Sequence, residues 1–306
     1  MRLAKTLTAF ALPALLCPVA AKAGPILPDD PTVAGSLALW ARQAGTNFNG
    51  TTWADSSGNG NDLNLPITTS PQFTSPTVPV ASAPTITAGA YSGQTVNGVL
   101  FRDTQNDLLG ADLGPTNNLT QATIFVVYST PDTSSGTRPA GIGSPSAGTG
   151  DINNFHIAID GSLRYDNGAN TGVDDPSGEL LVRAARFNSS LVTNWQFTGD
   201  TIDVTIGPNA DNGGSAGSIL SSDQFFLGDI RTGSTSNVSG GGTAGEVFIS
   251  SAIAYTGALT DDQVVGIIEF LALTPEGNPA LIPEPGSLLL VAAGAGAVGL
   301  LRRRAS

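Results

Sequence analysis

Short apolar runs and alternating apolar and polar residues occur along most of the chain between residues 36 and 255. The run "ATIFVVYS" (122–129) is β-branched and aromatic, and it is short enough for a buried strand. Further strands are predicted at 36–42, 98–102, 154–160, 179–187, 201–206, 224–228 and 246–255. Many short strands separated by Gly, Asn, Ser and Pro predict an all-β fold, an antiparallel β-sandwich or jelly roll.

The segment "LTDDQVVGIIEFLAL" (259–273) has a helical pattern instead. Thr260 precedes its apolar residues and is followed three places later by Gln263, which is the spacing of a capping box. Asp261 and Asp262 would lie in the first turn, where the helix dipole favours acidic side chains. The pattern therefore predicts one C-terminal amphipathic helix that closes the domain, with residues 274–281 as a linker after it.

The N-terminus has the layout of a secretory signal peptide. Arg2 and Lys5 precede an apolar run, and Ala21-Lys22-Ala23 forms a small-residue cleavage site. We expect residues 1–23 to be removed on export. The only cysteine, Cys17, lies in this segment, so the mature chain would have neither a disulfide nor a thiol nucleophile.

The C-terminus combines a short motif, an apolar run and a cationic cluster. Residues 286–301 are mostly apolar and predict a membrane helix, although the run is short and rich in Gly and Ala. A cationic cluster beside a membrane helix stays in the cytoplasm, so the main domain would lie outside. The motif is Pro283, Glu284 and Pro285, and the cluster is Arg302, Arg303 and Arg304.

These three parts, in this order at the end of the chain, resemble the PEP-CTERM sorting signal of exopolysaccharide-producing Gram-negative bacteria. The resemblance covers residues 282–306. It implies that a membrane-embedded exosortase-type enzyme processes the protein at the motif. The expected localisation is an inner-membrane-anchored intermediate and then the cell surface or extracellular matrix. A simple C-terminal anchor is the alternative.

The charge of the expected mature chain excludes some partners. Residues 24–284 contain seven Arg, no Lys and 25 acidic residues, which gives a net charge of −18. A surface of this sign repels nucleic acid and anionic lipid, so we expect no nucleic-acid partner.

The stretch "WADSSGNGNDLNL" (53–65) begins like a calcium-binding loop, with Asp55 at the first ligand position and Gly60 at the sixth. Position twelve is Pro66, which cannot supply a bidentate carboxylate, and this excludes an EF-hand. The favoured interpretation is structural, with Asp and Asn side chains bonded to backbone amides and Gly58 and Gly60 in left-handed conformations.

A weak calcium site remains as a second interpretation of the same loop. Its ligands would be Asp55, Asn59 and Asp62 with backbone carbonyl groups, because Ca²⁺ accepts scattered oxygen ligands. Apart from this calcium, the sequence predicts no cofactor.

The loop, the strand containing "LFR", "TIFVVYS" and the final strand and helix occur in an order that resembles LamG-like (concanavalin A-like) domains of bacterial surface proteins. The resemblance covers residues 34–273 and implies two antiparallel sheets packed face to face. Calcium-supported binding of carbohydrate or protein is common in that family. The expected LamG-like domain spans residues 24–273.

Catalytic signatures are absent from the sequence. Glucanases of the concanavalin A-like fold carry an E-x-D-x-x-E strand, and none of the five glutamates stands in that pattern. Two carboxylates from different strands could still meet. The single histidine, His156, is interpreted as a polar-face strand residue, and no glycine pattern of a nucleophile elbow accompanies a serine.

Tryptophans could stack on sugar rings if they line a groove. Trp40 and Trp53 are predicted to lie in the core, and the role of Trp195 is open.

Together these features predict an exported, surface-sorted, non-enzymatic binding or adhesion protein of the extracellular polysaccharide matrix, with carbohydrate as a candidate ligand. The alternatives are a ligand-free structural envelope protein and a diverged glycan hydrolase.

Overall fold

The computed structural model describes residues 24–65, 84–91, 94–102, 107–113, 119–130, 139–142, 155–157, 163–165, 180–188, 191–198, 201–208, 224–228 and 246–277. The expected signal peptide, the sorting motif, the membrane segment and the arginine cluster lie outside these ranges. No helix of the described part is long and apolar enough to cross a membrane.

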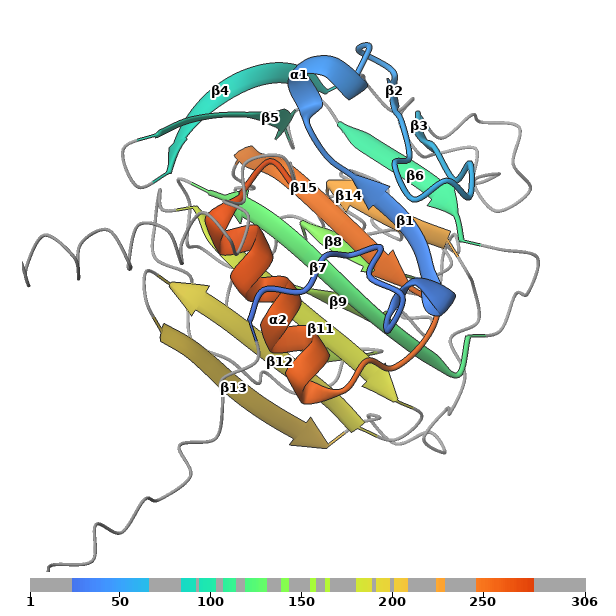
Figure 1. Cartoon of the computed structure of the whole chain (residues 1–306). Coiled ribbons are helices and arrows are strands. Elements are labelled where there is room, and N and C mark those ends of the chain that lie inside the picture. Colours follow the sequence, from blue (N-terminus) through green and yellow to red (C-terminus); the bar gives the residue numbers. More distant parts are fainter. Residues whose placement is uncertain are drawn as a thin grey trace, which may run out of the picture.

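Two antiparallel sheets form most of the protein (Figure 1). The larger sheet has the order β13 (Thr201–Pro208), β12 (Leu191–Thr198), β11 (Leu181–Asn188), β7 (Gln121–Ser129), β15 (Glu246–Tyr255), β5 (Gln94–Arg102) and β4 (Thr85–Tyr91), and β1 (Leu37–Ala41) also pairs with β15. The smaller sheet has the order β10 (Leu163–Tyr165), β9 (Phe155–Ile157), β8 (Ala140–Ile142), β14 (Gln224–Gly228), β6 (Leu108–Asp112), β3 (Leu63–Asn64) and β2 (Thr52–Trp53). The predicted all-β, antiparallel architecture is confirmed.

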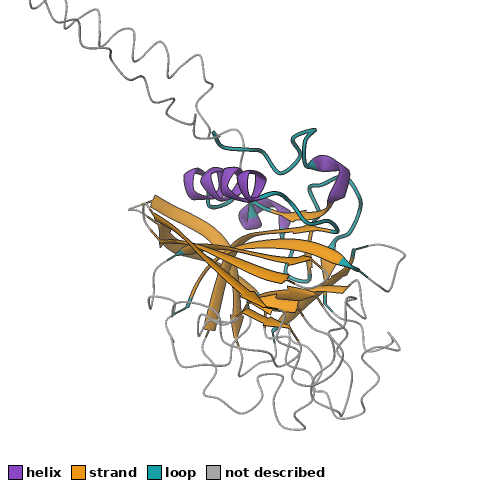
Figure 2. Ribbon diagram, turned by 90° about the horizontal axis from the view of Figure 1, so that it is seen from below, coloured by secondary structure: helices purple, strands orange, loops and turns teal. Residues whose placement is uncertain are grey.

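Helical structure is confined to a 3-10 turn (Ala34–Ser36), α1 (Ala44–Asn47) and α2 (Asp261–Leu273) within the described residues. Figure 2 shows α2 lying on one side of the sheets. The molecule thus has three layers, with the larger sheet between the smaller sheet and α2.

Strand β7 is covered on both faces, which explains the apolar run at residues 124–128. Its residues Ile124, Val126 and Tyr128 belong to the core between the two sheets. Phe125 and Val127 belong to a second core between the larger sheet and α2. Because both faces of the strand are covered, residues 124–128 are apolar on both faces and alternation disappears, while buried Thr123 donates its hydroxyl to Gly257 O at 2.8 Å.

The predicted capping box of α2 is confirmed. The Thr260 side chain accepts a hydrogen bond from Gln263 N, and Gln263 Oε1 accepts one from Thr260 N at 2.8 Å. Asp261 and Asp262 lie in the first turn. Gln263 also donates through Nε2 to Thr32 O at 2.9 Å, which connects the start of the helix to the N-terminal segment.

Residues 24–33, here called the strap, run along α2. Ile26 N donates to Gly266 O at 2.9 Å, and the Ile26 side chain packs on the second core. The buried Tyr255 hydroxyl donates to Pro28 O at 2.9 Å. Burial, and then the charge of nearby Asp29, raise the pKa of Tyr255 far above its usual value, so the hydroxyl stays protonated and able to donate.

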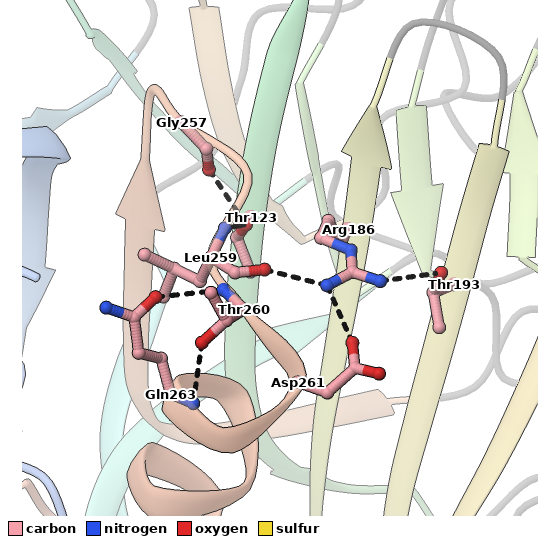
Figure 3. A network of polar contacts seen from close by, with 8 residues as sticks. All are labelled: Thr123, Arg186, Thr193, Gly257, Leu259, Thr260, Asp261 and Gln263. Atoms are coloured by element: carbon pink, nitrogen blue, oxygen red, sulfur yellow. Dashed lines mark hydrogen bonds and ion pairs between the residues drawn. The ribbon is translucent and has the colours of Figure 1, made fainter.

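Arg186 fastens the connection between β15 and α2 (Figure 3). Its Nη1 donates to Leu259 O at 2.7 Å and to Asp261 Oδ1 at 2.8 Å, and its Nη2 donates to Thr193 Oγ1 at 3.3 Å. The guanidinium lies 4.9 Å from the centre of the Trp195 ring. These contacts connect Arg186 of β11 to β12, to the segment before α2 and to α2 itself. We therefore assign the Arg186 side chain a structural role.

The first residues of the segment expected to be a linker contact the domain. Gln43 N donates to Glu276 O at 2.8 Å, and Asn97 N donates to Glu276 Oε1 at 2.6 Å. The domain contacts therefore extend beyond α2 to Gly277, where the described chain ends.

Some of the observed strands match the predicted ranges, and several others were not predicted from the sequence pattern. The ranges 224–228 and 246–255 match β14 and β15. Seven of the described strands were missed: β2, β3, β4, β6, β8, β10 and β12. Strands β2, β3, β8 and β10 have only two or three residues, too few for a pattern, whereas small residues in β4 and β6 and polar residues in β12 weaken the apolar signal. In the range 154–160, the described strand is limited to β9.

Candidate functional site

The loop 53–65 covers the free edge of β1. Trp40 N donates to Asp55 Oδ1 at 2.9 Å, and Ser56 N donates to Trp40 O at 2.9 Å. Side chains of the loop bond to the carbonyl groups of β1: Asn59 Nδ2 to Leu37 O at 2.8 Å, Asn61 Nδ2 to Ala38 O at 2.8 Å and Ser57 Oγ to Ala38 O at 3.2 Å. The loop thus takes the place of a neighbouring strand, and an exposed edge that could pair with other chains is covered.

The carboxylate of Asp55 organises this loop. Its Oδ1 accepts hydrogen bonds from Trp40 N and Ser57 N, and its Oδ2 accepts from Ser57 Oγ and Asn61 N. An ionised carboxylate offers about four acceptor positions, so protein donors occupy all of them. Asp62 Oδ1 accepts from Asp55 N at 2.8 Å and holds the other end of the turn.

The glycine conformations agree with this structural interpretation. Gly58 has φ of 86° and Gly60 has φ of 77°, which is the left-handed region expected from the sequence. Both glycines therefore permit the tight turn that brings Asp55 and Asp62 together.

Calcium binding by Asp55, Asn59 and Asp62 stays a prediction. The structure brings these three residues into one turn, but a cation at Asp55 would have to replace hydrogen bonds that the carboxylate already accepts. Within the described ranges, no group of three or more His, Cys, Asp or Glu residues could hold a metal ion.

All three tryptophans are buried. Trp40 and Trp53 lie in the core, as predicted, and Trp195 lies in the core beneath α2. Trp53 Nε1 donates to Arg42 O at 3.0 Å. None of these rings is exposed for stacking on a sugar in this structure.

Three polar side chains lie together on the side of β11 and β12 that faces the smaller sheet. They are Arg183, Asn194 and Gln196, and we call them the inner polar cluster. On β12, Asn194 and Gln196 flank Trp195, which belongs to the opposite core. All three are buried, and Arg183 Nη2 donates to Gln196 Oε1 at 2.9 Å.

Asn194 is the amide side chain of this cluster at the β12 position before Trp195. Its side chain is 2 % exposed, and its Oδ1 accepts no hydrogen bond from any partner among the described residues. A buried acceptor without a donor is costly, so such an atom calls for an explanation such as a bound hydroxyl group or water. The sequence-based predictions did not include these residues, although the alternation in "LVTNWQFT" (191–198) places Asn194 and Gln196 on one face.

The remaining candidates are dispersed. Glu276 bonds to Asn97, Glu246 is exposed at the start of β15, and Glu269 lies on α2. Glu179 and Glu284 lie outside the described residues, and so do Pro283, Pro285 and the arginine cluster 302–304. His156 lies in β9, opposite Arg164 of β10, and its side chain is outside the described part.

Comparisons with known proteins bear on the fold. The sequence matches no protein-family profile and no curated protein. Among solved structures, a mutant GH54 α-L-arabinofuranosidase soaked with 4-nitrophenyl α-L-arabinofuranoside is 19 % identical, with a TM-score of 0.51. The alignment covers 77 % of this chain and 53 % of that one, so the chain spans about half the length of the enzyme.

Two further structures are similar at lower scores. An arabinofuranosidase complexed with arabinofuranosyl-α-1,2-xylobiose is 19 % identical with a TM-score of 0.49, covering 72 % of this chain and 50 % of that one. Domain 4 of the extracellular GH43 arabinanase AbnA from Geobacillus stearothermophilus, in complex with arabinotriose, is 14 % identical with a TM-score of 0.38, covering 76 % of this chain and 98 % of the domain.

The prediction that this protein is not an enzyme is contradicted by the first of these similarities. The matched structure belongs to a glycoside hydrolase, and at 19 % identity the similarity shows a shared fold. The lack of E-x-D-x-x-E excluded a single arrangement of catalytic carboxylates, whereas acid and nucleophile can also come from different strands.

Proposed function

We propose that the protein is an exported, surface-sorted LamG-like jelly-roll protein that binds carbohydrate of the extracellular polysaccharide matrix. The observation that carries this proposal is the inner polar cluster, and in particular the buried Asn194 Oδ1 without a donor. The fold similarity to a carbohydrate-active enzyme supports it as an analogy.

The cluster has the chemistry that sugar recognition needs. Amide side chains such as those of Asn194 and Gln196 both donate and accept, which suits a hydroxyl group, and Arg183 adds a further donor. A sugar hydroxyl donated to Asn194 Oδ1 would satisfy that atom. Because the three side chains are buried, a ligand reaches them only through local opening where β10 faces β12.

The binding test uses Asn194→Leu, which removes the unpaired acceptor and keeps a similar volume. We expect affinity for the producer's own polysaccharide, measured by calorimetry, to fall at least about tenfold, equivalent to about 1.4 kcal/mol. The melting temperature should not fall, because removing a buried unpaired group costs little stability.

Asn188→Leu is the matched control. Asn188 is exposed at the end of β11, so this variant should bind like the original chain. Equal affinity of Asn194→Leu and Asn188→Leu, or no binding of any polysaccharide by the original chain, would contradict the proposed site.

Hydrolysis is the second candidate function, and the similarity to the arabinofuranosidase favours it. The same polysaccharide, incubated with the purified chain, is assayed for released reducing sugar. Release above that of heat-inactivated protein would assign the chain a hydrolytic role, whereas binding without release would leave carbohydrate binding alone.

Export and sorting have a separate test. Ile26 of the strap donates to Gly266 O of α2 and is the first residue with such a contact to the domain. Cleavage after Ala23 would leave a mature N-terminus at Gly24, two residues before this contact, which supports the proposed cleavage site. We expect mass spectrometry of surface fractions to find a chain that starts at Gly24 and lacks the arginine cluster. An intact chain in the cytosol, with Met1 present, would refute this part of the proposal.

A further inference from the structure

The outer strands of the two sheets differ in their protection against pairing with other chains. Natural proteins blunt such edges by making strands short, by placing charges or proline on them, or by covering them. Strand β13 contains Asp203 and ends at Pro208, β10 has three residues including Arg164, and β2 has two residues. The free edge of β1 is covered by the loop 53–65.

Strand β4 has none of these protections among the described residues. It is seven residues long, its sequence "TITAGAY" contains no charge and no proline, and it is the last strand on its side of the larger sheet. Within the described part of the chain, residues 85–91 make backbone hydrogen bonds to β5 and to no other element. The outward-facing amide and carbonyl groups of β4 are therefore available to another strand.

The side chains of β4 are also accessible. Thr85, Ile86 and Ala88 are exposed, and Ile86 is 46 % exposed. Among the described residues, the other large apolar side chain with such exposure is Leu273 on α2. An uncharged edge strand that presents an apolar side chain is a site for strand addition.

We propose that β4 pairs with β4 of a second copy of this chain, in antiparallel orientation about a two-fold axis. A two-fold interface needs a surface complementary to itself, and any antiparallel strand pairs with its own copy in this way. Charge favours this edge for self-association, because the chain carries a net charge of −12 and the two copies would repel each other least where the strand is uncharged.

The pairing has a defined size limit. It joins the two larger sheets into one continuous sheet and uses the free edge of each β4, so assembly stops at the dimer. The contact is narrow, and a single pair of strands buries less surface than a permanent interface, so the dimer should be weak and concentration-dependent.

Cysteine cross-linking tests this pairing in the full chain. Changing Cys17→Ser removes the only native thiol, and Ile86→Cys, Thr87→Cys and Ala88→Cys are then made singly. Residues that face each other across an antiparallel pair have Cα atoms about 4.5–5.5 Å apart, which a disulfide can bridge. We expect the position nearest the axis to give at least about tenfold more disulfide-linked dimer than Leu273→Cys, the control on the other exposed apolar side chain.

A second experiment measures dimerisation after a charge is placed on the edge strand β4. Ile86→Lys adds like charges to both copies at the interface and should weaken dimerisation at least about tenfold by ultracentrifugation, while the melting temperature stays unchanged because the side chain is exposed. Leu273→Lys is the matched control and should dimerise like the original chain. The proposal is overturned if cross-linking at β4 does not exceed the control, if Ile86→Lys and Leu273→Lys dimerise equally, or if a ladder of larger oligomers forms instead of a dimer.

Discussion

Replacing Asp55 with alanine is expected to lower the free energy of unfolding by about 2–4 kcal/mol, because four hydrogen bonds to one carboxylate are lost. One of the lost bonds involves Trp40 N, whose residue is buried, and an unpaired buried amide is costly. The loop would also release the edge of β1. Urea denaturation followed by tryptophan fluorescence measures the change.

Two further variants test whether the loss of stability is specific to the hydrogen bonds of Asp55. Asp112→Ala removes a carboxylate that is exposed at the end of β6, and we expect a change within about 0.5 kcal/mol. Asp55→Asn keeps one acceptor oxygen and should fall between Asp55→Ala and the original chain. A loss for Asp55→Ala no larger than that for Asp112→Ala would contradict the organising role of Asp55.

The same loop allows a direct check on calcium. If Asp55, Asn59 and Asp62 bind calcium, adding the ion raises the melting temperature and a chelator reverses the rise, because a ligand that binds the folded state stabilises it. Asp62→Asn should reduce that rise. An unchanged melting temperature removes the calcium interpretation and leaves the cover of the β1 edge as the reason for the motif.

Replacing Gly266 with alanine is expected to destabilise the protein by up to about 2 kcal/mol, although alanine is the better helix former. A Cβ atom at Gly266 would lie 2.5 Å from Ile26 Cγ1 and 2.6 Å from Ile26 Cδ1. Relieving that overlap costs about 1–3 kcal/mol, whereas the higher helix propensity of alanine contributes about 1 kcal/mol.

A double-mutant cycle separates these two effects. In an Ile26→Ala background the two nearest atoms are gone and only Cβ of residue 26 remains close, at 3.0 Å. Gly266→Ala should then become neutral or stabilising, with a coupling energy of about 2 kcal/mol between the two sites. Gly35→Ala, where a Cβ atom meets nothing within 4 Å, is the control and should change stability by less than about 0.5 kcal/mol. If Gly266→Ala costs the same in both backgrounds, the strap does not determine the choice of glycine.

Local signals were sufficient for some elements. The start of α2 follows from Thr260, Gln263 and the acidic first turn, because a capping box depends only on residues that are neighbours in sequence. Strands β14 and β15 are dense in β-branched and aromatic residues, so their bounds were also predictable.

Other features depend on partners that are distant in sequence. The stretch 53–65 suggested a turn, but the sequence did not reveal that Asn59 and Asn61 bond to β1, more than twenty residues away. Strand β12 shows the same limit, because the pattern places Asn194 and Gln196 on one face without indicating whether that face meets solvent or the other sheet.

The sequence by itself thus determined the all-β class, the antiparallel strands with the strongest patterns, the closing helix and the turn at Gly58 and Gly60, since each depends on residues within a few positions. Only the tertiary structure decided that the loop covers β1, that Trp195 is buried, that Gly266 accommodates Ile26 and that no other described strand pairs with the outer edge of β4. The physical reason is that burial, edge exposure and hydrogen-bond partners are set by segments brought together in folding, and no local pattern encodes which segments those are.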